Sequence, residues 1–339
     1  MLNWIDEDYL REIIKTRSGE AKLGQVLHCF QDSHWSAKAP GFVILGIEED
    51  IGVRGNLGRP GTAAAFRNFM AAFSNLQANR FLPLEQIYLG GRLVFPALMQ
   101  KAARLNPELD DERKEIFALC SQIDEEVTET ISDIVSAGHV RIGIGGGHNN
   151  AYGNIKGCSQ ALNKSLAVLN IDPHADFRTR EGRHSGNGFS YAFADGFLKR
   201  YAVFALQSDY NHEAMLEKLE EDPKLQFISM RELIRTEPGQ QEKLLKDLLN
   251  WFEDAPFGLE LDLDVLTGFP VSALNAGGLS ISELRRFLML STELKAPRYL
   301  HLAEASPGQA NSDQEKQLIG KTLSVLVSDF LKSYPLGPR

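Results

Sequence analysis

The residues best suited to chemistry are two carboxylates and an imidazole that alternate along one short stretch. Asp172, His174 and Asp176 directly follow the apolar run 166–171, which is typical of a buried strand. Alternate side chains of an extended backbone point the same way, so these groups converge just beyond the strand. Carboxylate oxygens with a little imidazole nitrogen, and no thiolate, suit Mn²⁺ better than a structural Zn²⁺. Taken alone, the stretch is also compatible with a charged turn.

A second acidic stretch carries two more carboxylates on one side of a predicted strand, 257–264. Asp262 and Asp264 share their parity with Glu260, and the leucines between them face the other way. Stripping water from two carboxylates costs free energy, so a buried strand normally avoids them unless a cation offsets the loss. An exposed edge strand is the alternative, but the apolar flanks argue against it. We therefore expect a metal ion beside Asp262 and Asp264.

His148 completes the set at the end of a third predicted strand, 139–144. It follows three consecutive glycines, which let the backbone turn sharply and let the histidine approach a neighbour closely. In an open parallel sheet, functional side chains gather outside the carboxyl ends of the strands. Four carboxylates and two imidazoles exceed what one ion needs, and two divalent cations about 3.5–4 Å apart would use them all. The predicted metal ligands are His148, Asp172, His174, Asp176, Asp262 and Asp264.

Strand and helix patterns alternate along the chain and provide the scaffold for these residues. Near-continuously apolar strands predict a mostly parallel sheet covered on both faces, in a single α/β domain of residues 41–335. Residues 1–40 are expected to form one helix and a polar approach segment. The eight predicted strands are 41–47, 86–89, 139–144, 166–171, 201–206, 225–229, 257–264 and 298–304. Helices are expected near 4–16, 62–76, 111–137, 149–163, 211–222, 241–253, 280–294 and 312–333.

Composition limits the class of protein. The chain has 339 residues, 43% of them hydrophobic and 24% charged, which is typical of a globular protein with a large core. A net charge of −9 argues against a nucleic-acid partner, and no apolar run approaches the ~20 residues of a membrane span. The three cysteines form no CxxC pair and the first residues lack a signal-peptide pattern, so we expect a cytoplasmic protein with reduced thiols.

The segment 48–62, EEDIGVRGNLGRPGT, is rich in glycine and carries Arg54 and Arg59. A glycine-rich loop between a strand and a helix is suited to cradle a phosphate, but neither GxGxxG nor a Walker pattern is present. We expect either a surface loop or a binding loop here.

The motifs together resemble the ureohydrolase family, which includes arginase, agmatinase and formimidoylglutamase. That family has a histidine after a glycine pair, a D-x-H-x-D motif, a D-x-D motif and a glutamate near the last strand. Here they are GGGH ending at His148, DPHAD at 172–176, DLD at 262–264 and LAEASP at 302–307, in the family's order over residues 40–330. The resemblance implies a three-layer αβα fold, a dimanganese centre and hydrolysis of a C–N bond at an amidine or guanidine carbon.

The resemblance also implies roles for individual residues. His148 and Asp176 would hold one manganese and His174 the other, while Asp172, Asp262 and Asp264 would complete both coordination shells. Asp176 would take a proton from the attacking water, which makes it catalytic together with His174 and Glu304. Glu304 would pair with the guanidinium or formimino nitrogen of the substrate, and its alternative is a surface acid at a strand end. Family members suggest a homo-oligomer, either a trimer or a hexamer, and a small-molecule substrate.

Positions that differ from the arginase motifs indicate which branch of the family the chain resembles. Arg178 stands where arginases have an asparagine, and arginine binds carboxylates with two parallel hydrogen bonds. At this position the chain resembles the formimidoylglutamase branch, and the alternative role of Arg178 is a structural ion pair with a neighbouring ligand aspartate. In the segment RHSGNGF, Ser185 and Asn187 occupy the polar positions of the family's substrate loop. His184 precedes them and is either a substitute for the arginase proton shuttle or a plain surface residue.

The best prediction is hydrolysis of N-formimidoyl-L-glutamate to L-glutamate and formamide. Arg178 and Arg183, with Arg59 if its loop reaches the site, would make the pocket mouth basic and favour a dicarboxylate over the cationic tail of agmatine. The alternatives are an agmatinase, arginase or guanidino-acid hydrolase that releases urea, and a non-catalytic metal-binding protein on the same fold. The presence of all six ligands argues against the last.

Overall fold

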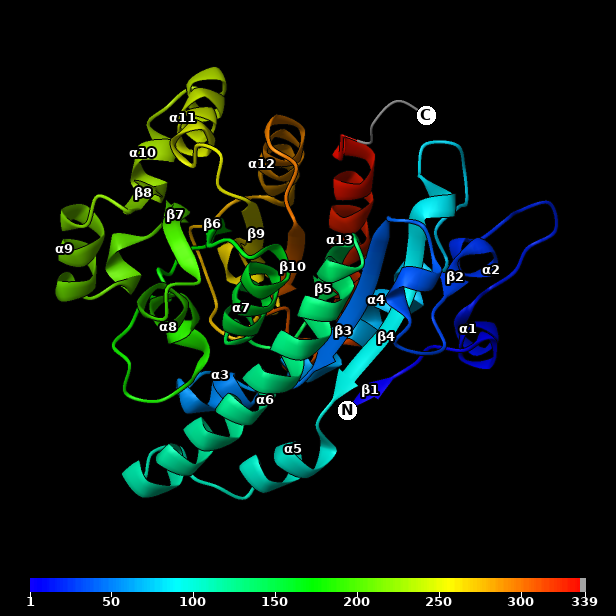
Figure 1. The fold of residues 1–339 in the computed structure, drawn as a ribbon, viewed down its shortest axis with the longest axis horizontal. Coiled ribbons are helices and arrows are strands. Elements are labelled where there is room, and N and C mark those ends of the chain that lie inside the picture. Colours follow the sequence, from blue (N-terminus) through cyan, green and yellow to red (C-terminus); the bar gives the residue numbers. More distant parts are fainter. Residues whose placement is uncertain (336–339) are drawn as a thin grey trace.

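Ten strands of the computed structural model, which describes residues 1–335, pair into one sheet (Figure 1). Seven of them are buried nearly throughout, and most of their residues are valine, leucine, isoleucine and other apolar types. The strands are β1 (Leu2–Asn3), β2 (His28–Cys29), β3 (Phe42–Glu48), β4 (Ile87–Val94), β5 (Val140–Ile144), β6 (Leu166–Ile171), β7 (Leu198–Leu206), β8 (Leu225–Ser229), β9 (Phe257–Asp262) and β10 (Tyr299–Ala303).

The order of strands across the sheet is β1-β4-β3-β5-β10-β9-β6-β7-β8, and β2 also pairs with β4. The pairing of β1 with β4 is antiparallel, whereas the other pairings are parallel. Four strands that lie far apart in the sequence, β5, β10, β9 and β6, are therefore neighbours at the centre. Their carboxyl ends open on the same edge of the sheet, where ligands bind in sheets of this kind.

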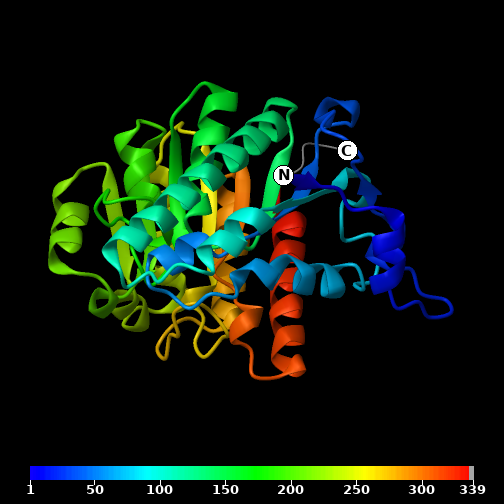
Figure 2. The ribbon, with the colours of Figure 1, turned by 90° about the horizontal axis from the view of Figure 1, so that it is seen from below.

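Helices cover both faces of the sheet, as the two perpendicular views show (Figures 1 and 2). One apolar cluster packs residues of α4, α10, α11, α12 and α13 against one face. A second cluster packs residues of α5 to α9 against the other. The helices are α1 (Glu7–Ile13), α2 (Leu23–Val26), α3 (Ile51–Gly55), α4 (Ala65–Phe73), α5 (Pro96–Ala102), α6 (Asp110–Ser136), α7 (Asn150–Leu162), α8 (Gly188–Ala194), α9 (Glu213–Glu221), α10 (Met230–Ile234), α11 (Pro238–Trp251), α12 (Ile281–Leu294) and α13 (Asp313–Ser333).

The eight predicted strands are confirmed, and the layered α/β architecture with them. The count of eight was too low because β1 and β2 are only two residues long and have no periodic pattern. Both pair with β4, so residues 1–40 contribute to the same sheet. The glycine-rich segment 48–62 is also more ordered than a plain loop, since it contains the short helix α3. None of the helices in residues 1–335 is long and apolar enough to cross a membrane.

Candidate metal centre and active site

Three of the four central strands, β5, β6 and β9, deliver the predicted metal ligands to one place, and β10 delivers Glu304 beside them. Asp172 follows β6 directly, Asp262 is the last residue of β9, and His148 lies four residues after β5. Register keeps these ends level: Ile171 of β6 pairs with Leu261 of β9, and Leu261 pairs in turn with Leu302 of β10. The carboxylates and imidazoles that are separated by more than 100 residues in the sequence therefore meet at one edge of the sheet.

The Nδ1 atom of His148 is the centre of a first group of ligands. It lies 2.9 Å from Asp176 Oδ2, 2.9 Å from Asp262 Oδ2 and 3.3 Å from Asp172 Oδ2. These four residues offer ligand atoms that all lie within 4.8 Å of one another, and His148, Asp172 and Asp262 are almost wholly buried. One imidazole nitrogen and three carboxylate oxygens are a donor set that Mn²⁺ accepts.

His174 forms a second group beside the first. Its Nδ1 lies 3.4 Å from Asp172 Oδ1 and 3.9 Å from Asp264 Oδ2. Asp172 thus faces both histidines, one through each carboxylate oxygen. Asp264 lies in a 3-10 turn beyond the end of β9, where its backbone NH donates to Asp262 Oδ1 at 2.7 Å. The strand predicted over 257–264 thus ends two residues early, at Asp262, and the turn after it keeps Asp264 beside Asp262.

The backbone at the site is strained in two places. Asp176 has φ of 46° and Glu304 has φ of 62°, in the left-handed region that residues with a side chain rarely adopt. Such strain persists only where the surrounding structure enforces it, and it concentrates at functional sites. In the turn before Asp176, the backbone NH of Ala175 donates to Asn211 Oδ1, and Tyr201 donates to the carbonyl oxygen of Ala175.

Burial and mutual repulsion raise the pKa values of three acids of the cluster, whereas hydrogen bonds to His148 and His174 outweigh burial and lower the pKa of Asp172. Burial raises the pKa of Asp262 to about 6, and the neighbouring Asp172 adds to the shift. The pKa of Asp264 lies well above its ordinary value for the same reasons, with Asp262 as the nearest repelling charge. Burial lowers the pKa of His174, but hydrogen bonding to Asp172 and the negative charges of the surrounding aspartates together outweigh it and raise the value to about 9. A cluster of buried acids that repel one another is one that a cation would stabilise.

A cavity of about 310 Å³ opens over these ligands. Its lining combines metal ligands with arginines, amides and a tyrosine: Val53, Asn56, Leu57, Gly58, Arg59, His174, Asp176, Arg178, Ser185, Tyr210, Asn211, His212, Met215, Asp262, Asp264, Ser272, Ala273 and Glu304. Four of the six candidate metal ligands therefore line a pocket large enough for a small organic molecule.

Glu304 lines the cavity with one carboxylate oxygen held and the other free to bind. Its Oε1 accepts a hydrogen bond of 2.6 Å from the backbone NH of His148. Its Oε2 is buried and has no hydrogen-bond partner within residues 1–335. Burial raises the pKa of Glu304 to about 8, and the charge of Asp262 adds to this. A buried carboxylate oxygen without a partner is rare in proteins, and here it faces a site where a substrate nitrogen can satisfy it.

Two arginines border the cavity in different ways. Arg178 is half-exposed, and its only charged contact within residues 1–335 is a distant one of 3.9 Å to Glu181, so it is not paired with a candidate metal ligand there. Arg59 also lines the cavity, so the glycine-rich segment does reach the site. Its guanidinium donates to the carbonyl oxygens of Val271 at 3.0 Å and Ser272 at 3.1 Å. Arg59 thus anchors its loop, whereas Arg178 keeps its donors available.

Three residues predicted for the pocket mouth or the substrate loop lie elsewhere. Arg183 is buried and pairs with Asp124 of α6 at 2.7 Å, so it does not contribute to a basic mouth. Asn187 accepts a 2.6 Å hydrogen bond from Arg183 and is absent from the cavity lining. The ring of His184 is buried, with Nδ1 accepting from the NH of Gly186 and Nε2 close to Glu181. Burial and the charge of Arg178 lower the pKa of His184 to about 4, so it is neutral.

Ser185 does reach the cavity wall, where its Oγ accepts from Asn56. Asn56, Tyr210 and His212 are lining residues that sequence reasoning missed. Asn56 lies in the glycine-rich segment whose role had been left open, and Tyr210 stacks on His174 with ring centroids 5.6 Å apart. Neither Tyr210 nor His212 belongs to a motif, so only the three-dimensional arrangement identifies them.

Comparison with known proteins agrees with this arrangement. The sequence model of the arginase family matches residues 40–327. Formimidoylglutamase of Chromobacterium violaceum is 28% identical over 246 residues, which cover 70% of each chain. Formimidoylglutamase of Streptococcus pyogenes serotype M3 is 28% identical over 228 residues, which cover 63% of this chain and 62% of the relative.

Solved structures share the fold at lower identity. Formimidoylglutamase from Bacillus subtilis superposes with a TM-score of 0.77 at 16% identity and covers 95% of both chains. Formiminoglutamase from Trypanosoma cruzi, solved with Mn²⁺, gives a TM-score of 0.69 at 19% identity, covering 92% of this chain and 99% of the other. The fold implied by the sequence motifs is thereby confirmed. Since the family match extends over most of the sequence, this chain belongs to the arginase family.

Proposed function

We propose that this protein hydrolyses N-formimidoyl-L-glutamate to L-glutamate and formamide. The observation that carries this proposal is the free carboxylate oxygen of Glu304, which lies on the floor of the cavity among the metal-ligating carboxylates. It is placed to accept hydrogen bonds from an amidine nitrogen, while Arg178 at the cavity wall is available for a substrate carboxylate. Relatives named formimidoylglutamase support the choice of substrate.

The donor set fits two Mn²⁺ ions per chain. His148, Asp172, Asp176 and Asp262 would hold one ion. His174 and Asp264, with Asp172 and Asp262 shared, would hold the other. When bound, the ions would supply Lewis acidity and lower the pKa of the attacking water.

The residues around the centre would transfer the proton and hold the substrate. Asp176 is nearly buried, lines the cavity and would accept a proton from the attacking water. The water oxygen forms a bond to the formimino carbon, and the bond from that carbon to the glutamate nitrogen breaks. The departing amine takes up a proton, so the products are formamide and glutamate. Glu304 would hold the formimino group in place during this exchange, which is a positioning effect as much as a charge effect.

Recognition of the rest of the substrate falls to the cavity wall. Arg178 would bind a carboxylate through its planar fork, with Ser185 beside it. Asn187 and His184 would act indirectly, because they hold the turn around Ser185 and Gly186. A homo-oligomeric state and a cytoplasmic location remain predictions.

A product assay tests the proposal. Mn²⁺-loaded protein is offered N-formimidoyl-L-glutamate, agmatine and L-arginine, and formamide and urea are measured separately. We expect formamide from the first substrate, little or no urea from the other two, and loss of at least 100-fold in kcat/KM in Glu304→Gln, since removing one preorganised group costs about that much. Efficient urea release from agmatine with no formamide from N-formimidoyl-L-glutamate would assign the chain to another activity of the family.

A further inference from the structure

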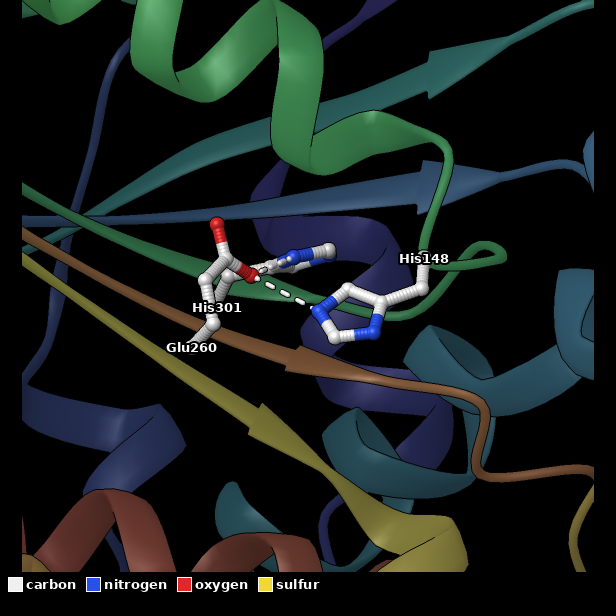
Figure 3. Close-up of side chains that lie close together, drawn as sticks. All are labelled: His148, Glu260 and His301. Carbon is white, nitrogen blue, oxygen red and sulfur yellow. Dashed lines mark hydrogen bonds and ion pairs between the residues drawn. The ribbon is translucent and has the colours of Figure 1, made fainter. Parts of the chain in front are cut away.

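Glu260 and His301 form a buried polar row with the ring of His148 (Figure 3). The Nε2 atom of His148 contacts Glu260 Oε2 at 3.5 Å, while Nδ1 faces the three aspartates. The same Glu260 oxygen lies 2.6 Å from His301 Nδ1, and His301 Nε2 lies 3.2 Å from the carbonyl oxygen of Gly145. His148, Glu260 and His301 are fully buried.

The sheet itself builds this row. Glu260 of β9 is paired in register with His301 of β10 on one side and with Asn170 of β6 on the other. Glu260 and Asp262 share a parity on β9, so the strand presents one carboxylate to the metal site and the next one behind it. Glu260 and His301 both project from strands and not from loops, so the geometry of the pair is rigid.

The cationic side chain of Arg141 lies on the other side of Glu260 and is linked to it through Asn154. Arg141 of β5 is fully buried and donates to Asn154 Oδ1 at 2.8 Å, and Asn154 lies 3.5 Å from Glu260 Oε1. Burial lowers the pKa of Arg141 to about 10, and the charge of Glu260 opposes that shift. At Gly143, an added Cβ would lie 1.9 Å from Arg141 Cζ, so the glycine makes room for the guanidinium.

These contacts argue against a third metal ion at His148, Glu260 and His301, although the three offer suitable ligand atoms. A separation of 2.6 Å between His301 and Glu260 is a direct, charge-assisted hydrogen bond. The neighbouring Arg141 already supplies a positive charge for Glu260. The arrangement instead matches a common one in metal sites, in which a carboxylate accepts a hydrogen bond from the one ring nitrogen of a ligating histidine that does not bind the metal.

We infer that Glu260, held by His301, is a positioning residue that keeps the proton of His148 on Nε2 and so presents the lone pair of Nδ1 to a metal ion. Carboxylates face both ring nitrogens of His148, and a carboxylate can only accept a hydrogen bond. A metal ion on Nδ1 would leave Nε2 as the nitrogen that carries the proton, with Glu260 as its acceptor. Asp172, Asp176 and Asp262 around Nδ1 would then surround the ion instead of a proton. This inference rests on the proposed dimanganese centre.

The inference has a selective consequence. His148 belongs to only one of the two ligand groups, and His174 of the other group has no contact with Glu260 among the described residues. Loss of the support should therefore weaken one Mn²⁺ site and leave the other. A general structural role of Glu260 would weaken both sites together or neither.

Equilibrium dialysis and electron paramagnetic resonance with Mn²⁺ test this on the full chain. The wild type should bind two ions and give the spectrum of a coupled pair. Glu260→Gln should weaken one site about 10- to 100-fold, so that near one equivalent of Mn²⁺ the spectrum is that of an isolated ion. Glu260→Asp keeps the charge beside Arg141 and so protects folding, but it withdraws the carboxylate from His148 by about 1.5 Å. It should weaken the same site.

Asp329→Asn is the matched control, because Asp329 is a buried acid that pairs with Arg285 far from the cavity. It should bind two ions with wild-type affinity even where its melting temperature falls. Wild-type affinity at both sites in Glu260→Gln and Glu260→Asp would overturn the inference, and so would equal weakening of both sites. A wild type that binds no Mn²⁺ would instead overturn the proposed metal centre, and the inference with it.

Discussion

At the residue scale, the proposed specificity rests on two side chains that line the cavity. Glu304 offers a carboxylate oxygen without a protein partner, and Arg178 offers a guanidinium whose nearest charged contact is 3.9 Å away. Groups that the protein leaves unpaired are those that a ligand can satisfy. A substrate with a formimino nitrogen at one end and a carboxylate at the other matches both, whereas agmatine matches only the first.

Replacement of Arg178 by alanine should therefore affect substrate binding and not the metal. We expect KM for N-formimidoyl-L-glutamate to rise roughly 10- to 100-fold, a modest range because water screens a half-exposed arginine. Arg178→Lys should restore only part of the loss, because lysine lacks the planar fork. Steady-state kinetics with metal analysis of each variant checks this. Loss of Mn²⁺ from Arg178→Ala would show that the arginine supports the metal site instead.

At the element scale, the strand ends carry the metal ligands and the connecting segments carry the rest. The segment 178–188 is fastened to α6 by one buried ion pair, Arg183 with Asp124. Arg183 also donates to the backbone carbonyl oxygens of Asn149 and His184, which links the segment to the start of α7. This pair positions Ser185 on the cavity wall without touching the cavity.

Asp124→Asn should destabilise the fold because it leaves Arg183 buried without a counter-charge. We expect the free energy of unfolding to fall by roughly 3 kcal/mol, measured by denaturant titration. Asp247→Asn is the matched control, since Asp247 pairs with Lys243 on the surface of α11 and both side chains are more than half exposed. The control should change stability by less than about 0.5 kcal/mol. Equal effects of the two substitutions would contradict a structural role for Arg183.

The sequence predicted the elements well wherever a periodic pattern was long. All eight predicted strands and all eight predicted helices are present, and the six ligands converge as their spacing at strand ends indicated. Arg183 was misplaced because an arginine in a polar loop gives no sign that Asp124, 59 positions away, will bury it. Glu260 was noted only for its parity with the aspartates. Its partner His301 lies on another strand and becomes visible only through the register of the sheet.

At the scale of the whole molecule, the acidic cluster couples stability to pH and to metal. The pKa of Glu304 is raised to about 8 and that of His174 to about 9. A group whose pKa is raised by folding contributes stability that is fully present below its unfolded pKa and is lost as the pH rises through its folded pKa. The contribution of both groups to the free energy of unfolding of the metal-free protein therefore falls as the pH rises from 6.5 to 8. The pKa of His184 is lowered from 6.5 to about 4, so its titration changes stability only below about pH 6.5.

We expect the melting temperature of the metal-free protein to fall from pH 6.5 to pH 8. The rise in melting temperature on adding Mn²⁺ should grow over the same range, because metal binding displaces protons from the ligands. Differential scanning fluorimetry with and without Mn²⁺ measures both trends, and Mg²⁺ serves as a control for nonspecific ionic effects. A Mn²⁺ effect that shrinks as the pH rises would contradict this account of the cluster.

The central claim is that residues from the ends of three strands, β5, β6 and β9, hold two metal ions at the cavity. Anomalous diffraction from crystals of Mn²⁺-loaded protein tests it most directly. We predict two peaks about 3.5–4 Å apart, one beside His148 Nδ1 and one beside His174 Nδ1. No peak at this position in a Mn²⁺-loaded crystal, or a peak between Glu260 and His301 instead, would contradict it.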